Sequence, residues 1–220
     1  MIKVFKHIYY WIDERLDMHD YIKKDILDKP IPKGINLAYC FGGITFFLFL
    51  MLAATGFFMA IYYIPSPTQA YDSVDYMTYQ IPMGRIVRGV HHWSANLMVI
   101  TIFLHMIRVF IYGAYKKPRE INWITGVMLF SLVMAFGFTG YLLPWDQKAY
   151  WATRVGTSML GTVPVIGEYV SLMIRGGNEL GALTLARFYA LHVIFLPIAT
   201  VCLLIGHFLM IRRQGISTPL

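Results

Sequence analysis

Residues 90–106 read VHHWSANLMVITIFLHM, an apolar run of helix length with His91 near one end and His105 near the other. Fourteen residues of α-helix rise about 21 Å and return to within roughly 40° of the starting direction. The two histidines therefore share a face of one helix. They lie near opposite edges of a hydrocarbon layer about 30 Å thick.

A second run, residues 191–208, reads LHVIFLPIATVCLLIGHF and carries His192 and His207 fifteen residues apart. This spacing gives a rise of about 22 Å and an offset of roughly 60°. If the two runs cross a membrane in the same direction, His91 lies level with His192 and His105 lies level with His207. The sequence thus predicts two histidine pairs, one near each membrane surface.

Ionisable side chains inside a membrane are costly and usually functional, although a single histidine there often makes only an interhelical hydrogen bond. Two matched levels favour cofactor ligation. Zinc is disfavoured because each level offers only two ligands, without a cysteine or carboxylate beside them. Haem needs only two axial imidazoles, and iron ligated in this way has no open position and carries electrons.

Composition agrees with a membrane protein, since the 220 residues are 57% hydrophobic and only 14% charged. The formal net charge is +7, but the basic residues lie between apolar runs, which argues against a nucleic-acid partner. Cys40 and Cys202 belong to no CxxC or CxxCH pattern, so we expect neither a disulfide framework nor ordinary c-type haem attachment. We expect no signal peptide at the start.

The predicted fold class is an all-α membrane protein, a four-transmembrane-helix bundle forming one domain over residues 1–220. The expected spans are residues 36–64, 86–112, 121–143 and 183–211. Residues 1–30, closed by Pro30 and Pro32, have the apolar stripe of a helix lying on the membrane surface or docked on a soluble partner. Two short helices, 150–160 and 165–174, are expected in the loop between spans three and four.

Loop charge predicts the orientation. The N-terminal segment holds seven Lys/Arg, residues 116–119 hold three and the tail holds Arg212 and Arg213, whereas the loop after the first span holds none before Arg85. The positive-inside rule then puts both termini on the cytoplasmic side. His91 and His192 therefore belong to the outer level, and His105 and His207 to the inner level.

Two further features suit flat cofactors. Glycines fourteen residues apart occur in the first span, Gly42 and Gly56, and in the third, Gly126 and Gly140. They would let a macrocycle lie against the backbone, or they reflect ordinary close helix packing. Arg88 and Arg108, each three residues from a histidine, would pair with haem propionates or extend to the water interface. We expect His92, His7, His19 and Cys202 to be structural or without a role.

Several motifs together resemble the cytochrome b family. They are YCFGG (39–43), the span from Arg88 to Arg108, KKPRE (116–120), GYLLPWDQ (140–147), RFY (187–189) and HFLMIR (207–212). The chain is most similar to the short b6-type subunit, the N-terminal half of a split cytochrome b. The fifteen-residue histidine spacing is also b6-like.

The resemblance implies an electron-transfer subunit of a bacterial quinol:cytochrome c (or plastocyanin) reductase, not active alone, in a respiratory or photosynthetic membrane. His91 and His192 would ligate a low-potential b haem, and His105 and His207 a high-potential one. Quinol would be oxidised on the outer side and quinone reduced on the inner side, coupled to proton translocation. Expected partners are a subunit IV-like C-terminal half of cytochrome b, a Rieske iron–sulfur protein, a c-type cytochrome or cytochrome f, lipid and a second copy of the complex.

The resemblance also assigns single residues. Cys40 would carry a third, high-spin haem through one thioether bond. The turn Pro144, Trp145, Asp146, Gln147 would form one wall of the quinol pocket. The family's Pro-Glu-Trp-Tyr motif of the other wall is absent, so a second subunit must supply it. Arg212 would edge the quinone-reduction site or bind anionic lipid. His92 departs from the plant and cyanobacterial pattern, which favours menaquinol as substrate.

Two other readings remain. One is a dihaem cytochrome b subunit of a hydrogenase or formate dehydrogenase, which lacks the paired glycines and the Pro-Trp-Asp-Gln loop. The other is a haem-free transporter or structural membrane subunit, which predicts no visible absorption.

Overall fold

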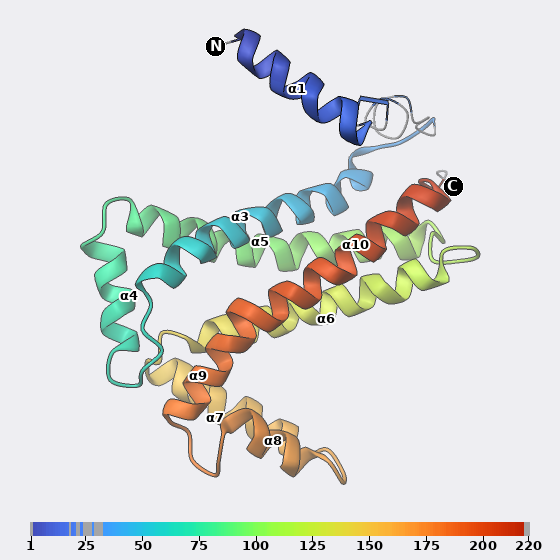
Figure 1. The fold of residues 1–220 in the computed structure, drawn as a ribbon. Helices are drawn as coiled ribbons and strands as arrows, with labels where there is room; N and C mark the ends of the chain where they lie inside the picture. The colour runs from blue at the N-terminus through green and yellow to red at the C-terminus, as the bar shows by residue number, and fades with distance from the viewer. Residues whose placement is uncertain (1, 18, 21–22, 24–27, 29–32, 218–220) are drawn as a thin grey trace.

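The computed structural model describes residues 2–17, 19–20, 23, 28 and 33–217, and its regular structure is helical (Figure 1). In chain order the helical elements are α1 (Ile2–Leu16), the 3₁₀ turn η2 (Leu37–Cys40), α3 (Phe41–Tyr62), α4 (Ala70–Tyr79), α5 (Gly84–Ile111), α6 (Glu120–Leu142), α7 (Gln147–Gly161), α8 (Gly167–Arg175), α9 (Ala182–Ala190), the π-turn η3 (Leu191–Phe195) and α10 (Leu196–Gln214).

Four helical segments are long and apolar enough to cross a membrane. They are Leu37–Tyr62, Gly84–Ile111, Glu120–Leu142 and Ala182–Gln214, the last made of α9, η3 and α10 in one continuous helix. The predicted fold class, an all-α four-span membrane bundle, is confirmed. Helix α3 packs along α5, and α10 packs along α6.

The two ends of this bundle differ. The start of α3 and the end of α10 lie at one end, and α4, α7 and α8 lie at the opposite end (Figure 1). We call these the terminus-side end and the loop-side end. Helices α3 and α6 run from the terminus-side end to the loop-side end, and α5 and α10 run back.

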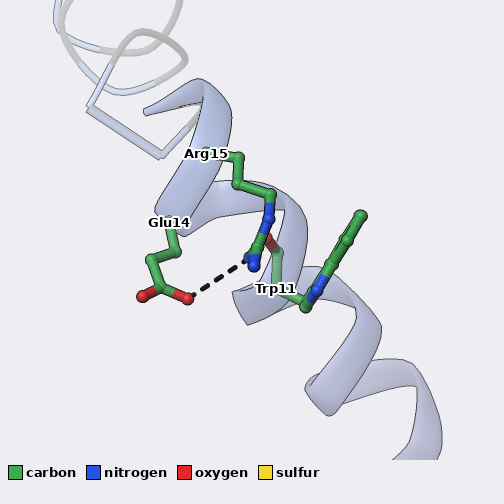
Figure 2. Close-up of polar contacts among 3 residues, drawn as sticks. All are labelled: Trp11, Glu14 and Arg15. Atoms are coloured by element: carbon green, nitrogen blue, oxygen red, sulfur yellow. Dashed lines mark hydrogen bonds and ion pairs between the residues drawn. The ribbon is translucent and has the colours of Figure 1, made fainter.

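Helix α1 stands apart from the bundle (Figure 1). Its apolar and aromatic side chains are exposed, among them Phe5, Ile8, Tyr9 and Trp11. This exposure is typical of a helix that lies on a membrane surface or on another protein. Figure 2 shows the polar contacts of its last turn, where Arg15 lies 4.2 Å over the Trp11 ring and 3.4 Å from Glu14. The predicted end at Pro30 and Pro32 lies outside the described residues.

The loop-side end contains the two short helices that were predicted, as α7 and α8, and one that was not. Helix α4 lies in the segment expected to be only a polar connection. Its four buried residues recur at helical spacing, with exposed polar and aromatic residues between them. One face of α4 therefore packs on α3 and α5.

The middle of the bundle is a small apolar core between the two histidine levels. Leu48, Met98, Ile102 and Val133 are buried there and meet Phe49, Leu52 and Phe130. Most large apolar side chains of the four spans point outward instead, as expected when lipid is the solvent. The core therefore separates the two ends of the bundle, and other contacts position the histidine rings.

Candidate cofactor sites

The four predicted ligands come together in two pairs. His91 on α5 and His192 in η3 are close enough to interact electrostatically, and so are His105 on α5 and His207 on α10. We call His91 and His192 the loop-side pair, and His105 and His207 the terminus-side pair. All four rings are partly buried among the four spans.

Threonine hydroxyls hold three of the four imidazoles. The Oγ1 atoms lie at hydrogen-bond distance from the ring atom Nδ1 in the pairs Thr55–His91 (2.9 Å), Thr139–His192 (2.9 Å) and Thr125–His207 (3.2 Å). Sequence reasoning missed these residues. The available signal was that each threonine directly precedes one of the paired glycines.

The threonines also determine which ring nitrogen of each histidine carries the proton. Each donates its own hydroxyl hydrogen to a backbone carbonyl of its helix: Thr55 to Met51 (2.6 Å), Thr139 to Ala135 (2.8 Å) and Thr125 to Asn122 (2.8 Å). The hydroxyl oxygen is thus left to accept from Nδ1–H. In this tautomer Nε2 keeps its lone pair for a metal.

The paired glycines lie directly against the histidine rings. A Cβ placed on each glycine would approach the ring atom Cε1 of its histidine, at 2.7 Å for Gly140 and His192, 3.0 Å for Gly42 and His105, 3.3 Å for Gly56 and His91, and 3.7 Å for Gly126 and His207. The prediction that these glycines make room for a macrocycle stays a prediction. The structure adds that each glycine faces a histidine ring on the neighbouring helix.

The π-turn explains the unequal histidine spacing. In η3 the backbone N–H of Leu196 bonds to the carbonyl of Leu191, five residues back, so this turn holds one extra residue. Fifteen residues between His192 and His207 then make about the same number of turns as fourteen regular residues between His91 and His105. The 60° offset expected from an ideal helix is reduced accordingly.

These residues fit haem. Each level offers two protein nitrogens, and among the described residues no group of three or more His, Cys, Asp and Glu side chains is placed to share a metal ion. Two ligands on facing helices suit iron that a macrocycle already coordinates. The threonine-bound tautomer and the glycine beside each ring support the same assignment.

The three predicted arginines lie at the ends of the spans. The Arg108 guanidinium is half-buried and lies 4.0 Å over the Tyr39 ring, which ties η2 to the end of α5. Arg88 on α5 and Arg212 on α10 are exposed. Arg108 is therefore on the terminus-side level, close enough to interact electrostatically with His105.

Both cysteines are free and exposed. Cys40 ends η2 and is two residues before Gly42, which contacts His105, so it lies at the terminus-side level. Cys202 lies on α10 between the two levels.

The Pro144–Gln147 turn starts α7 at the loop-side end. Asp146 caps that helix, its carboxylate accepting the Ala149 N–H at 2.8 Å, and Trp145 is in the left-handed region with φ 52°. Tyr63 donates to the Leu143 carbonyl at 2.7 Å and stacks on Tyr189. Burial raises the pKa of Tyr63 well above its usual range. Tyr63 was not predicted, and it anchors the backbone directly before this turn.

The fold and these contacts define a four-helix membrane protein with a histidine pair at each end of its bundle. Residues 26–215 match the family model described as cytochrome b/b6/petB, and the chain belongs to this family. Membership implies that it binds b-type haem.

Curated relatives match over nearly their whole length. The chain is 50% identical to the menaquinol:cytochrome c reductase cytochrome b subunit of Geobacillus thermodenitrificans and 48% identical to that of Bacillus subtilis, each over 97% of this chain and 98% of the relative. It is 46% identical to cytochrome b6 of Prochlorococcus marinus, over 97% of both chains. A solved hyperthermophilic respiratory complex III contains a similar chain with a TM-score of 0.88 and 30% identity, covering 95% of this chain and 56% of that one.

Proposed function

We propose that this chain is the b6-type cytochrome b subunit of a quinol:cytochrome c (or plastocyanin) reductase. One observation carries the proposal: each end of the bundle holds a histidine pair with a glycine against every ring. His91 and His192 would hold one b-type haem, and His105 and His207 the other. When bound, the haems supply one-electron chemistry across the membrane.

The chain's own residues position the ligands in this function. Thr55, Thr125 and Thr139 keep three imidazoles in the tautomer that offers Nε2 to iron. Arg108, on the terminus-side level, would face a haem propionate there. Arg88 would play the same part at the loop-side level.

The loop-side end would be the outer face, where quinol is oxidised. Pro144, Trp145, Asp146 and Gln147 would form one wall of that pocket, held by the Asp146 cap. A subunit IV-like C-terminal half of cytochrome b would supply the other wall. The names of the Geobacillus and Bacillus relatives, together with His92, support menaquinol as the substrate.

One electron from each quinol would go to a Rieske iron–sulfur protein and on to a c-type cytochrome or cytochrome f. The other would cross from the loop-side pair to the terminus-side pair, where quinone is reduced. Protons would then be released on the outer face and taken up on the cytoplasmic face, which carries both termini. Arg212 would edge the quinone-reduction site or bind anionic lipid, in a homodimeric complex.

Cys40 would attach a third, high-spin haem through one thioether bond. Its exposure at the end of η2, beside the terminus-side pair, supports this assignment. Cys202 is also exposed but lies in the middle of a span, and we propose no haem there.

The test is haem staining of this subunit after acid–acetone extraction and denaturing electrophoresis of the purified complex. Histidine-bound haem leaves, whereas thioether-bound haem stays. We expect a stained band near 25.3 kDa that persists in the matched control Cys202→Ser and disappears in Cys40→Ser. A normal b-haem spectrum without the band would remove only the third haem. A complex without any b-haem spectrum would contradict the whole function.

A further inference from the structure

The two histidine pairs differ in the hydrogen bonds of their Nδ1 atoms. In the loop-side pair both rings bond to a threonine, Thr55 for His91 and Thr139 for His192. In the terminus-side pair only His207 has such a partner, Thr125 at the longer distance of 3.2 Å. His105 Nδ1 is buried and has no hydrogen-bond partner among the residues that the structure describes.

The difference has a local cause in the sequence around the glycines. At three sites the threonine that bonds the ring stands one residue before the glycine. At Gly42 the preceding residue is Phe41, which has no hydroxyl. The chain directly before Phe41 forms the 3₁₀ turn η2, because α3 begins only at Phe41.

A hydrogen bond from Nδ1–H makes an imidazole more electron-rich and a stronger donor to iron. Stronger donation stabilises the oxidised metal over the reduced one and lowers the reduction potential, a lever that proteins use at haem sites. The loop-side pair has this bond on both ligands and the terminus-side pair on one. The positive charge of Arg108 beside His105 acts in the same direction, because it favours the added electron.

We propose that Thr55 and Thr139 are positioning residues that hold the loop-side haem site at a lower reduction potential than the terminus-side site, where Phe41 leaves His105 without an acceptor. This inference rests on the proposed function, since it requires a haem at each level. Each site takes up and gives back one electron without further reactants.

The test is an optical redox titration of the purified complex, fitted to two one-electron components. Thr55→Val and Thr139→Val should each raise the lower potential and narrow the gap. A hydrogen bond of ordinary net strength changes the reduced-to-oxidised ratio about fivefold, or about 40 mV at 59 mV per tenfold change. Thr125→Val should raise the higher potential and widen the gap. Thr55→Ser keeps a hydroxyl and should restore the original value.

Two further variants guard the result. Thr101→Val removes a threonine hydroxyl from α5 that bonds Thr45 and Met98 rather than a histidine, so it should leave both potentials unchanged. Phe41→Thr places a hydroxyl before Gly42, so it should lower the higher potential even if a valine variant loses its haem.

An unchanged gap in the Thr55, Thr139 and Phe41 variants, with both haems bound, would overturn this inference and leave the proposed function intact. Equal shifts in Thr101→Val would also overturn it. Absence of b haem from the unsubstituted complex would instead overturn the proposed function.

Discussion

The loop-side and terminus-side ends of the bundle each hold a histidine pair, by different local means. At the loop-side end a π-turn carries His192, and threonines bond both rings. At the terminus-side end a 3₁₀ turn precedes Gly42, and the Nδ1 atom of His105 has no hydrogen-bond partner in the described part of the chain. The comparison teaches that the helix pattern sets the level of each histidine, whereas local features, the π-turn and the threonines, set how each ring is oriented and bonded.

The largest expected effect comes from changing the spacing within the last span. Deleting Leu203 leaves the π-turn in place and rotates His207 by about 100° relative to His192, so at least one b haem should be lost. Deleting Ile194, inside η3, also gives a fourteen-residue spacing but restores a regular helix, and both haems should remain. Haem per chain, measured as the pyridine haemochrome, separates the two. Equal haem content in both deletion variants would show that the π-turn does not set the ligand geometry.

The next effect compares two glycines on α6. In Gly140→Ala the new Cβ would meet the His192 ring at 2.7 Å, which must displace the ligand, whereas in Gly126→Ala it would lie 3.7 Å from the His207 ring, an ordinary contact. We expect the first variant to lose the loop-side haem and the second to keep both, as judged by the absorbance of the reduced complex. Loss of haem in Gly126→Ala with retention in Gly140→Ala would contradict the claim that Gly140, and not Gly126, must lack a side chain for haem to bind.

A smaller effect concerns the helix caps at the two ends. Asp146→Ala removes the cap of the fifteen-residue helix α7 and should destabilise the loop-side end by about 1 kcal/mol. Asn36→Ala removes the cap of only the four-residue η2, where Asn36 accepts the Ala38 N–H, and should cost less. The midpoint temperature for loss of haem absorbance measures both. Asp146→Asn keeps a capping oxygen, so a defect in quinol oxidation by this variant at normal stability would instead assign the carboxylate a role beyond capping.

The smallest effect compares the side-chain ties to the backbone at each end. Tyr63→Phe removes the half-buried bond to Leu143 and should cost roughly 0.5–1 kcal/mol, whereas Gln214→Ala removes an exposed bond to Pro118 and should cost less. Because the folded-state pKa of Tyr63 is raised, its phenol stays protonated and the cost should be constant from pH 6 to about pH 9. Above about pH 10 tyrosine in the unfolded chain ionises, and the advantage over phenylalanine should shrink. Thermal denaturation across this pH range tests it, and a cost that varies between pH 6 and pH 8 would contradict the account.

The four spans could be predicted from the sequence because lipid selects long apolar helices, and the histidine levels follow from helical rise. The two short helices after Pro144 were likewise visible as apolar patterns. Helix α4 was not predicted, because Asp72 and Asp75 made its segment look like a polar connection. Its buried residues nevertheless recur at helical spacing.

The details of the histidine sites could not be predicted from the sequence. An ideal helix gives His192 and His207 a 60° offset, and only the i→i+5 bond of η3 shows how the offset is absorbed. The Thr-Gly dipeptides at 55–56, 125–126 and 139–140 were readable in the sequence, but nothing in it says that the hydroxyl meets a ring on another helix. The exception at Phe41-Gly42 could be interpreted only once the structure showed that His105 Nδ1 has no hydrogen-bond partner among the described residues.

The most direct test of the central claim, one b haem between each histidine pair, is the reaction with carbon monoxide of the reduced complex carrying Cys40→Ser. This variant leaves only non-covalent haem in the chain. The account predicts two b haems per chain whose spectrum does not change on adding carbon monoxide, because histidines fill both axial positions. A single b haem per chain, or a b-haem spectrum that shifts with carbon monoxide, would contradict it.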